Sequence, residues 1–124
     1  MMYKVEAIVR EEKLEDIKEA LHAIGVNGVT AYQVMGFGAQ RGYKTVVRGQ
    51  EIDAVLVPKI KLEVVVSSEE WKEKTIQTIC DVAHTGEIGD GKIFAFAISD
   101  AVKIRTGERG YDALQATNNA LDGE

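Results

Sequence analysis

Two stretches of this chain resemble each other, and this weak internal repeat limits the folds that the chain can adopt. Residues 4–9 (Lys-Val-Glu-Ala-Ile-Val) resemble residues 61–66 (Lys-Leu-Glu-Val-Val-Val), and both are rich in residues that favour strands. A short acidic stretch and then apolar residues at helical spacing follow each copy, and each helical pattern ends at a glycine, Gly25 or Gly86. The repeat therefore predicts two strand–helix units.

Further strand patterns complete each unit. Strands are predicted over residues 3–10, 29–35, 59–66 and 92–99, with one helix from Lys13 to Gly25 and a second after residues 67–70. Ser67 and Glu70 have the spacing of a capping box for that second helix. The order β-α-β-β-α-β predicts an α+β, ferredoxin-like sandwich: a four-stranded antiparallel sheet with both helices on one face. The whole chain, residues 1–124, is expected to form one domain.

The second face of such a sheet has no helix to cover it. Ile8, Val65 and Phe96 are expected on this face. Because a large exposed apolar surface is unusual in a monomer, the pattern predicts an oligomer.

Charge and composition exclude several classes of function. The net charge of −5 disfavours nucleic acid and anionic lipid as partners. The third predicted strand, residues 59–66, has no aromatic residue on which a base could stack, which argues against an RNA-recognition domain. No apolar run approaches the ~18 residues that a membrane span needs, and the N-terminus does not resemble a signal peptide. With one cysteine, we expect a cytoplasmic protein without direct membrane insertion.

Residues 37–57 form an unusually long connection between two predicted strands. Segments of this length in compact domains are usually functional or disordered, so we expect a protruding loop; an extended hairpin built on residues 43–47 is the alternative. Basic and acidic side chains balance along the segment, which favours a protein surface as its target. The side chains concerned are Arg41, Lys44, Arg48, Glu51 and Asp53.

A glycine-rich segment, residues 85–94, precedes the last predicted strand. Three glycines can turn successive backbone N–H groups toward one point, and Lys92 adds a positive charge to such an anion nest. The spacing matches a Walker phosphate loop, but Ile93 stands where a Mg²⁺-binding Ser or Thr belongs, and the segment leaves a helix rather than a strand. A glycine-rich turn with a solvated lysine remains the alternative to an anion site.

Side chains typical of catalysis are sparse. His22 and His84 are expected to be structural or solvated, and Cys80 is expected to pack in the core. Since neither a nucleophile motif nor a metal-binding spacing is present, we expect no enzymatic activity.

Motifs along nearly the whole chain resemble the P-II signal-transduction (nitrogen regulatory) protein family. They are Gly36-Phe37-Gly38 with Gln40 and Gly42, then Lys59 and Glu63, then Thr85-Gly86 through Gly89-Asp90-Gly91-Lys92-Ile93-Phe94, and finally Ile104-Arg105-Thr106-Gly107-Glu108. The resemblance implies a homotrimer that binds ATP or ADP in clefts between subunits. It also implies sensing of 2-oxoglutarate through a Mg²⁺–ATP complex. The protruding loop would control a membrane transporter, such as an ammonium channel, or an enzyme of nitrogen metabolism, with recruitment to the membrane by a transporter partner.

The resemblance also implies roles for individual residues. The nucleotide-binding residues would be Ile8, Thr30, Gly36, Gly38, Gln40, Glu63, Ile88, Gly89, Asp90, Gly91 and Lys92, with Lys103 and Arg105 supplied by the neighbouring subunit. The residues for 2-oxoglutarate would be Gln40, Arg41, Gly42 and Lys59, with Gln40 also ligating Mg²⁺. A fixed cation suits a dicarboxylate, and an amide oxygen suits Mg²⁺. Residues 109–124 would form a C-terminal tail.

Some positions depart from the family pattern. Ala39 stands where other members often have a basic residue, so one phosphate contact fewer is expected. Lys103 stands where Arg is common, which keeps the charge but loses the bidentate fork of a guanidinium. Ile52 and Gln50 occupy the loop positions of the modified Tyr and Ser of other members, so modification at those two places is not expected. These departures leave an alternative: a divergent adenine-nucleotide sensor that regulates a different transporter and has lost 2-oxoglutarate sensing.

Overall fold

The predicted order of strands and helices is confirmed, with four short elements added to it. The computed structural model describes residues 1–37, 45–47, 50–52 and 56–114. In chain order the elements are β1 (Met2–Arg10), the 3₁₀ helix η1 (Glu11–Lys13), α1 (Leu14–Ala23), β2 (Val29–Phe37), β3 (Thr45–Val47), β4 (Gln50–Ile52), β5 (Leu56–Val66), α2 (Glu69–Ala83), β6 (Lys92–Ile98) and α3 (Tyr111–Leu114).

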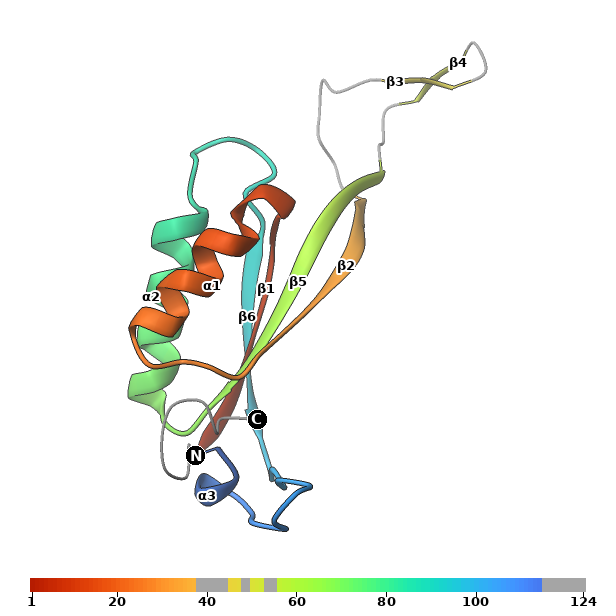
Figure 1. Ribbon diagram of the computed structural model, residues 1–124. Coiled ribbons are helices and arrows are strands. Elements are labelled where there is room, and N and C mark those ends of the chain that lie inside the picture. Colours follow the sequence, from red (N-terminus) through yellow and green to blue (C-terminus); the bar gives the residue numbers. More distant parts are fainter. Residues whose placement is uncertain (38–44, 48–49, 53–55, 115–124) are drawn as a thin grey trace.

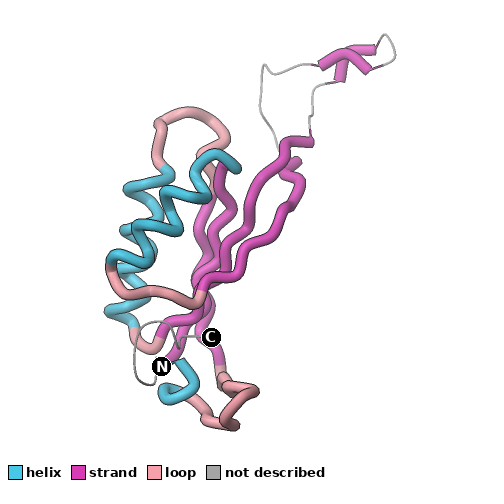
Figure 2. Tube along the Cα trace, viewed as in Figure 1, coloured by secondary structure: helices cyan, strands magenta, loops and turns pink. Residues whose placement is uncertain are grey.

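The long strands form one antiparallel sheet in the order β2-β5-β1-β6. The two repeated strands, β1 and β5, lie next to each other at its centre, where Val5 is opposite Val64. Helices α1 and α2 cover one face of the sheet and the other face is open (Figures 1 and 2). This is the ferredoxin-like α+β sandwich that the sequence predicts.

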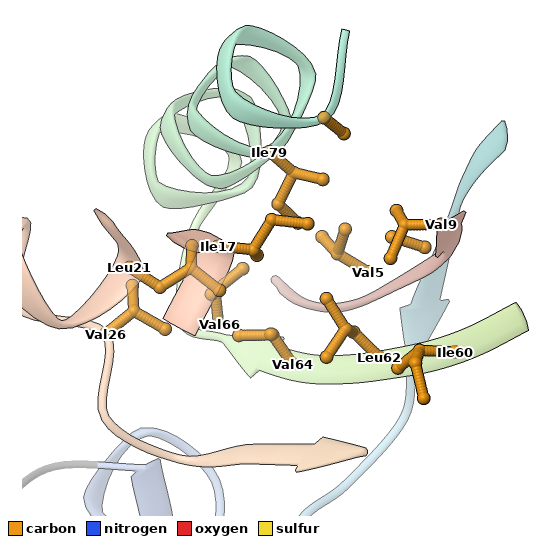
Figure 3. Packing of buried hydrophobic residues seen from close by; sticks show 12 residues of the cluster. Val5, Val9, Ile17, Leu21, Val26, Ile60, Leu62, Val64, Val66 and Ile79 are labelled. Carbon is orange, nitrogen blue, oxygen red and sulfur yellow. The ribbon is translucent and has the colours of Figure 1, made fainter. Parts of the chain in front are cut away.

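The core lies between the helices and the central strands (Figure 3). It contains alternate residues of β1 and β5, such as Val5 and Leu62, together with Ile17, Leu21 and Ile79 from the helices; these five side chains are at most 1% exposed. Burial of a side chain of this size stabilises the fold by about 1.5–3 kcal/mol. The side chains that recur every second residue along the strands and at helical spacing along α1 and α2 therefore pack into one core.

The open face is more polar at its centre than the sequence suggested. Ile8, Val65 and Phe96 lie on this face, as expected, since the register pairs Lys4 with both Val65 and Phe96. Between them, however, Glu6 forms ion pairs with Lys4 at 2.9 Å and with Lys61 at 3.3 Å. Charged residues thus occupy the middle of the face, and the expectation of a mainly apolar surface needs correction.

Helix α2 begins one residue later than the capping box implied. Ser68, not Ser67, is the N-cap, and its hydroxyl oxygen accepts a hydrogen bond from the backbone N–H of Trp71 at 3.2 Å. The predicted Ser67–Glu70 capping box was therefore wrong by one position.

Cys80 is exposed, which contradicts its expected place in the core. The preceding residue, Ile79, is 1% exposed and takes the position on α2 that faces the sheet. One residue along a helix rotates the side chain by about 100°, so Cys80 points away from the core.

The connection between β2 and β5 contains a short pair of strands. β3 and β4 pair only with each other, with Thr45 opposite Ile52. They lie beyond the ends of β2 and β5 (Figure 1). β3 falls in residues 43–47, on which the alternative of an extended hairpin is built; the residues between this pair and the long strands, 38–44 and 53–55, lie outside the described residues.

Candidate functional site

The glycine-rich turn between α2 and β6 packs against the end of β1. Gly91 has φ +103°, in the left-handed region that favours glycine. A Cβ atom on Gly91 would overlap the carbonyl oxygen of Ile8 and lie 2.8 Å from its carbonyl carbon. Gly91 therefore satisfies two requirements at once, backbone conformation and close approach, and it fixes the turn against β1.

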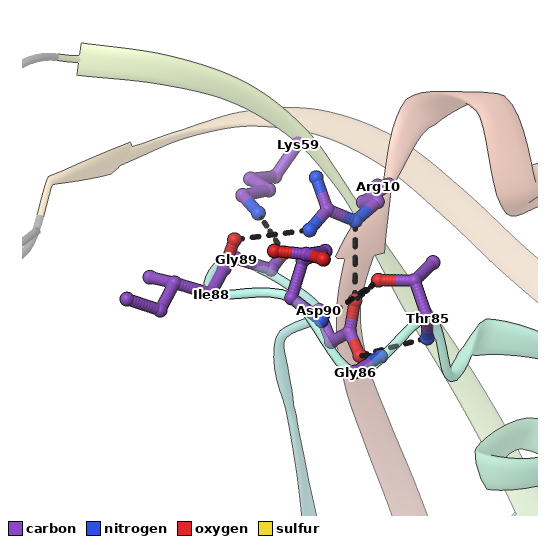
Figure 4. A network of polar contacts seen from close by, with 8 residues as sticks. Arg10, Lys59, Thr85, Gly86, Ile88, Gly89 and Asp90 are labelled. Atoms are coloured by element: carbon purple, nitrogen blue, oxygen red, sulfur yellow. Dashed lines mark hydrogen bonds and ion pairs between the residues drawn. The ribbon is translucent and has the colours of Figure 1, made fainter.

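The side chain of Asp90 accepts hydrogen bonds from other residues of the same turn (Figure 4). Its carboxylate accepts hydrogen bonds from the backbone N–H groups of Thr85 and Gly86, at 2.8 and 2.9 Å, and from the Thr85 hydroxyl. The guanidinium of Arg10 donates to the same carboxylate at 3.2 Å. The Thr85 hydroxyl and these N–H groups hold the pKa of Asp90 well below its usual range, so it is a carboxylate throughout the physiological pH range.

This arrangement refines the predicted anion nest. Backbone N–H groups do converge on an anion, but for Thr85 and Gly86 that anion is the chain's own Asp90. An external anion would have to use other donors of the turn. Lys92, which is exposed at the start of β6, is one such donor.

Lys59, a buried residue of β5, forms a hydrogen bond with the turn. Its side chain lies on the open face, it is 8% exposed, and its ammonium donates to the carbonyl oxygen of Gly89 (Figure 4). Gly36 on β2 leaves room for its stem, because a Cβ on Gly36 would lie 3.3 Å from Lys59 Cγ. A buried ammonium group with three donors is well suited to a carboxylate or phosphate ligand.

Two other predicted site residues lie further along the open face. Thr30 on β2 is opposite Glu63 on β5, and Glu63 is opposite Glu6 on β1. The hydroxyl of Tyr32 donates to the Glu63 carboxylate at 3.0 Å. The open face thus carries a row of polar side chains that ends near Lys59 and the turn.

Lys103 and Arg105 are not near the turn within one chain. They follow β6, and Figure 1 shows this segment at the opposite end of the sheet from the α2–β6 turn. Lys103 is buried and Arg105 is exposed. If these two residues act on the same ligand as the turn, they must come from another copy of the chain.

Sequence reasoning missed Arg10, although it makes two contacts with the turn. Besides the bond to Asp90, its guanidinium donates to the carbonyl oxygen of Ile88 at 3.0 Å. The signal was weak because Arg10 is a polar strand-end residue about 80 positions away in sequence, where no local spacing links it to the turn.

Comparison with known proteins identifies the family. The family model described as "Nitrogen regulatory protein P-II" matches residues 2–108. The chain belongs to the P-II family. A P-II protein of Rhodospirillum rubrum is 48% identical over 113 residues, which cover 91% of this chain and 100% of the relative. P-II protein 1 of Methanothermobacter thermautotrophicus is also 48% identical, with coverage of 91% and 97%.

Solved structures of P-II proteins share the fold. Arabidopsis thaliana PII bound to citrate has a TM-score of 0.73 and 43% identity, over 90% of each chain. The Bacillus subtilis GlnK–ATP complex has a TM-score of 0.76 and 36% identity, over 91% of this chain and 95% of that one. The family and the fold that the sequence motifs implied are both confirmed.

Part of the site expected for this P-II protein, including the expected Mg²⁺ ligand Gln40, lies outside the described residues. The residues concerned are Gly38, Ala39, Gln40, Arg41, Gly42, Tyr43, Lys44, Arg48, Asp53 and residues 115–124. Within the described part of the chain, no group of three or more His, Cys, Asp or Glu could hold a metal ion. In that same part, no helix has the length and apolar character to cross a membrane.

Proposed function

We propose that this P-II protein is a non-catalytic signalling regulator that binds ATP or ADP in clefts between the subunits of a homotrimer. The nucleotide would lie along Ile8, Thr30, Gly36, Gly38 and Glu63, with its phosphates at residues 88–92 and at Lys103 and Arg105 of the next subunit. The observation that carries the proposal is the turn that Gly91 fixes against β1, because this turn offers glycine backbone and the exposed Lys92, and the buried Lys59 donates to its Gly89 carbonyl. The ATP complex of the similar GlnK supports nucleotide as the ligand.

The separation of the two basic segments supports the assignment to an inter-subunit cleft. Arg105 lies at the opposite end of β6 from Lys92 within one chain (Figure 1). Two ends of one chain cannot hold the same phosphate group, whereas two copies packed through their open faces can. The exposed aromatic residues of that face, Phe94 and Phe96, suit this packing.

Sensing of 2-oxoglutarate forms the second part of the proposal. Lys59 would pair with the far carboxylate of the acid, Gln40 would ligate the Mg²⁺ that bridges the acid to ATP, and Arg41 and Gly42 would complete the site. The buried ammonium of Lys59 supports this role, since a desolvated cation attracts a carboxylate more strongly than a solvated one.

The output of the sensor would be residues 37–57. In the cytoplasm this segment would contact a transporter or an enzyme of nitrogen metabolism, with recruitment to the membrane where the partner is a transporter. Because Gln50 and Ile52 replace the modifiable residues, ligand occupancy alone would change the loop.

Calorimetric titration tests the proposal directly. The protein is titrated with ATP and with ADP, each with and without Mg²⁺ and 2-oxoglutarate. We expect nucleotide binding, and a second heat from 2-oxoglutarate that requires both Mg²⁺ and ATP. Lys59→Ala should abolish the second heat. Lys18→Ala is the control, because Lys18 is an exposed lysine on the helical side. Absence of nucleotide binding would refute the proposal.

The same titration separates the second candidate function, an adenine-nucleotide sensor that has lost 2-oxoglutarate sensing and regulates a different transporter. Ala39 and the altered loop positions favour this candidate, whereas the presence of Gln40 and Lys59 favours the first. ATP binding without any response to 2-oxoglutarate would select the divergent sensor.

Capture of the partner by full-length protein, but not by a variant that lacks residues 42–54, would establish that the loop makes the contact.

A further inference from the structure

Three consecutive residues of the glycine-rich turn are held by two cations from neighbouring strands. Arg10, at the end of β1, donates to the carbonyl oxygen of Ile88 at 3.0 Å and to the carboxylate of Asp90 at 3.2 Å. Lys59, on β5, donates to the carbonyl oxygen of Gly89, which lies between them. Each peptide group around Gly89 is therefore fixed from the side of the sheet (Figure 4).

The orientation of the N–H groups follows from these contacts. Both peptide bonds, Ile88–Gly89 and Gly89–Asp90, are trans. A planar trans peptide points its N–H away from its C=O. Since Arg10 holds the carbonyl of Ile88, the N–H of Gly89 points away from Arg10. By the same geometry, the N–H of Asp90 points away from Lys59.

Glycine at position 89 makes this fixation necessary. Gly89 has φ +103°, and a residue without a side chain has the widest choice of backbone conformations. Without an external restraint, the two peptide groups that flank it could rotate, and successive N–H groups would no longer face the same ligand. An anion site made of backbone N–H groups works only when they are held in one direction.

We infer that Arg10 is a positioning residue: by holding the carbonyl of Ile88 and the carboxylate of Asp90, it directs the N–H of Gly89 outward, toward the anionic ligand, while Lys59 directs the N–H of Asp90. This inference rests on the proposed nucleotide site, and it adds a residue that the resemblance did not assign. Arg10 acts on the ligand through the turn. Lysine could not replace it fully, because one ammonium lacks the planar fork that reaches two acceptors at a fixed separation.

The test combines hydrogen exchange of the nucleotide-free protein with ATP affinity, for Arg10→Gln, Arg10→Lys and the control Lys18→Gln. In Arg10→Gln we expect amide exchange in residues 85–92 to rise at least fivefold, exchange in the core strands to stay unchanged, and the Kd for ATP to rise at least fivefold. Arg10→Lys should give intermediate values for both readouts. Lys18→Gln, on the exposed surface of α1, should change neither.

The two readouts separate this inference from the proposed function. Weaker ATP binding with unchanged exchange in the free protein would mean that Arg10 contacts the ligand directly, which overturns the positioning role. Unchanged exchange and unchanged affinity would overturn it as well. If the wild type bound no ATP, the proposed function would fail, while the exchange data would still decide whether Arg10 holds the turn. If Arg10→Gln failed to fold, Arg10→Lys would provide the same decision.

Discussion

At the scale of single residues, Gly91 is the glycine of the turn where one added carbon atom should destabilise the protein most. In Gly91→Ala, a methyl group would overlap the backbone of Ile8, and backbone cannot move aside as a flexible side chain can. We expect a loss of more than about 3 kcal/mol in the free energy of unfolding, together with loss of ATP binding. Thermal unfolding and calorimetric titration measure the two effects.

Gly86→Ala is the matched control for this prediction. Gly86 belongs to the same turn and also has a positive φ, +90°, but the nearest atom to its Cβ would be His84 Cε1 at 3.9 Å. The free energy of unfolding of Gly86→Ala should fall only by the cost of placing alanine in the left-handed region, about 1–2 kcal/mol. Equal losses in the two variants would show that backbone conformation, and not contact with β1, makes Gly91 necessary.

The residues of the site were only partly predictable. The sequence identified the glycines and Lys92 because they lie within one short segment, residues 85–94, and the family resemblance identified Lys59. It could not distinguish Gly91 from Gly86, since the difference depends on Ile8, which lies on another strand. For the same reason Arg10 was missed, and so were the hydrogen bonds that the Asp90 carboxylate accepts from Thr85, Gly86 and Arg10.

At the scale of elements, helix α2 offers a test of where a helix begins. Ser68→Ala removes the hydroxyl that accepts from the N–H of Trp71, and it should destabilise the protein by about 1 kcal/mol. Ser67→Ala is the matched control, one residue earlier, and should cost less than about 0.5 kcal/mol. Urea unfolding of both variants gives the comparison. A larger loss from Ser67→Ala would mean that the helix begins at the earlier serine in solution.

Elements were predictable in type and order, but their ends were less so. The two-residue period over residues 3–10 and the helical period after Lys13 are local properties, so they gave β1 and α1 correctly. The start of α2 was misplaced by one residue because Ser67 and Ser68 both precede acidic residues, and the choice between them depends on backbone angles. Ser68 has φ −156° and ψ 167°, the extended conformation that an N-cap adopts.

At the scale of the whole molecule, the open face is the surface that assembly should cover. The sequence predicted that one face would lack helices, because two strand–helix units place both helices on the same side. It could not predict the ion pairs of Glu6 with Lys4 and Lys61, since these depend on the register of β1 and β5. Assembly through this face would bury the ion pairs, and a buried charge without a partner is costly.

Reversal of the charge at Glu6 should therefore dissociate the assembly. In Glu6→Lys, three lysines, at positions 4, 6 and 61, would face one another and the neighbouring subunits, so both repulsion and desolvation oppose association. We expect the wild type to sediment with the mass of a trimer and the variant with that of a monomer, and nucleotide binding to be lost with the inter-subunit cleft. Glu70→Lys, an exposed charge reversal on α2, should remain trimeric. A Glu6→Lys protein that kept the trimer mass would place the subunit interface on another surface, and Arg105 could then no longer reach the neighbouring turn across the open face.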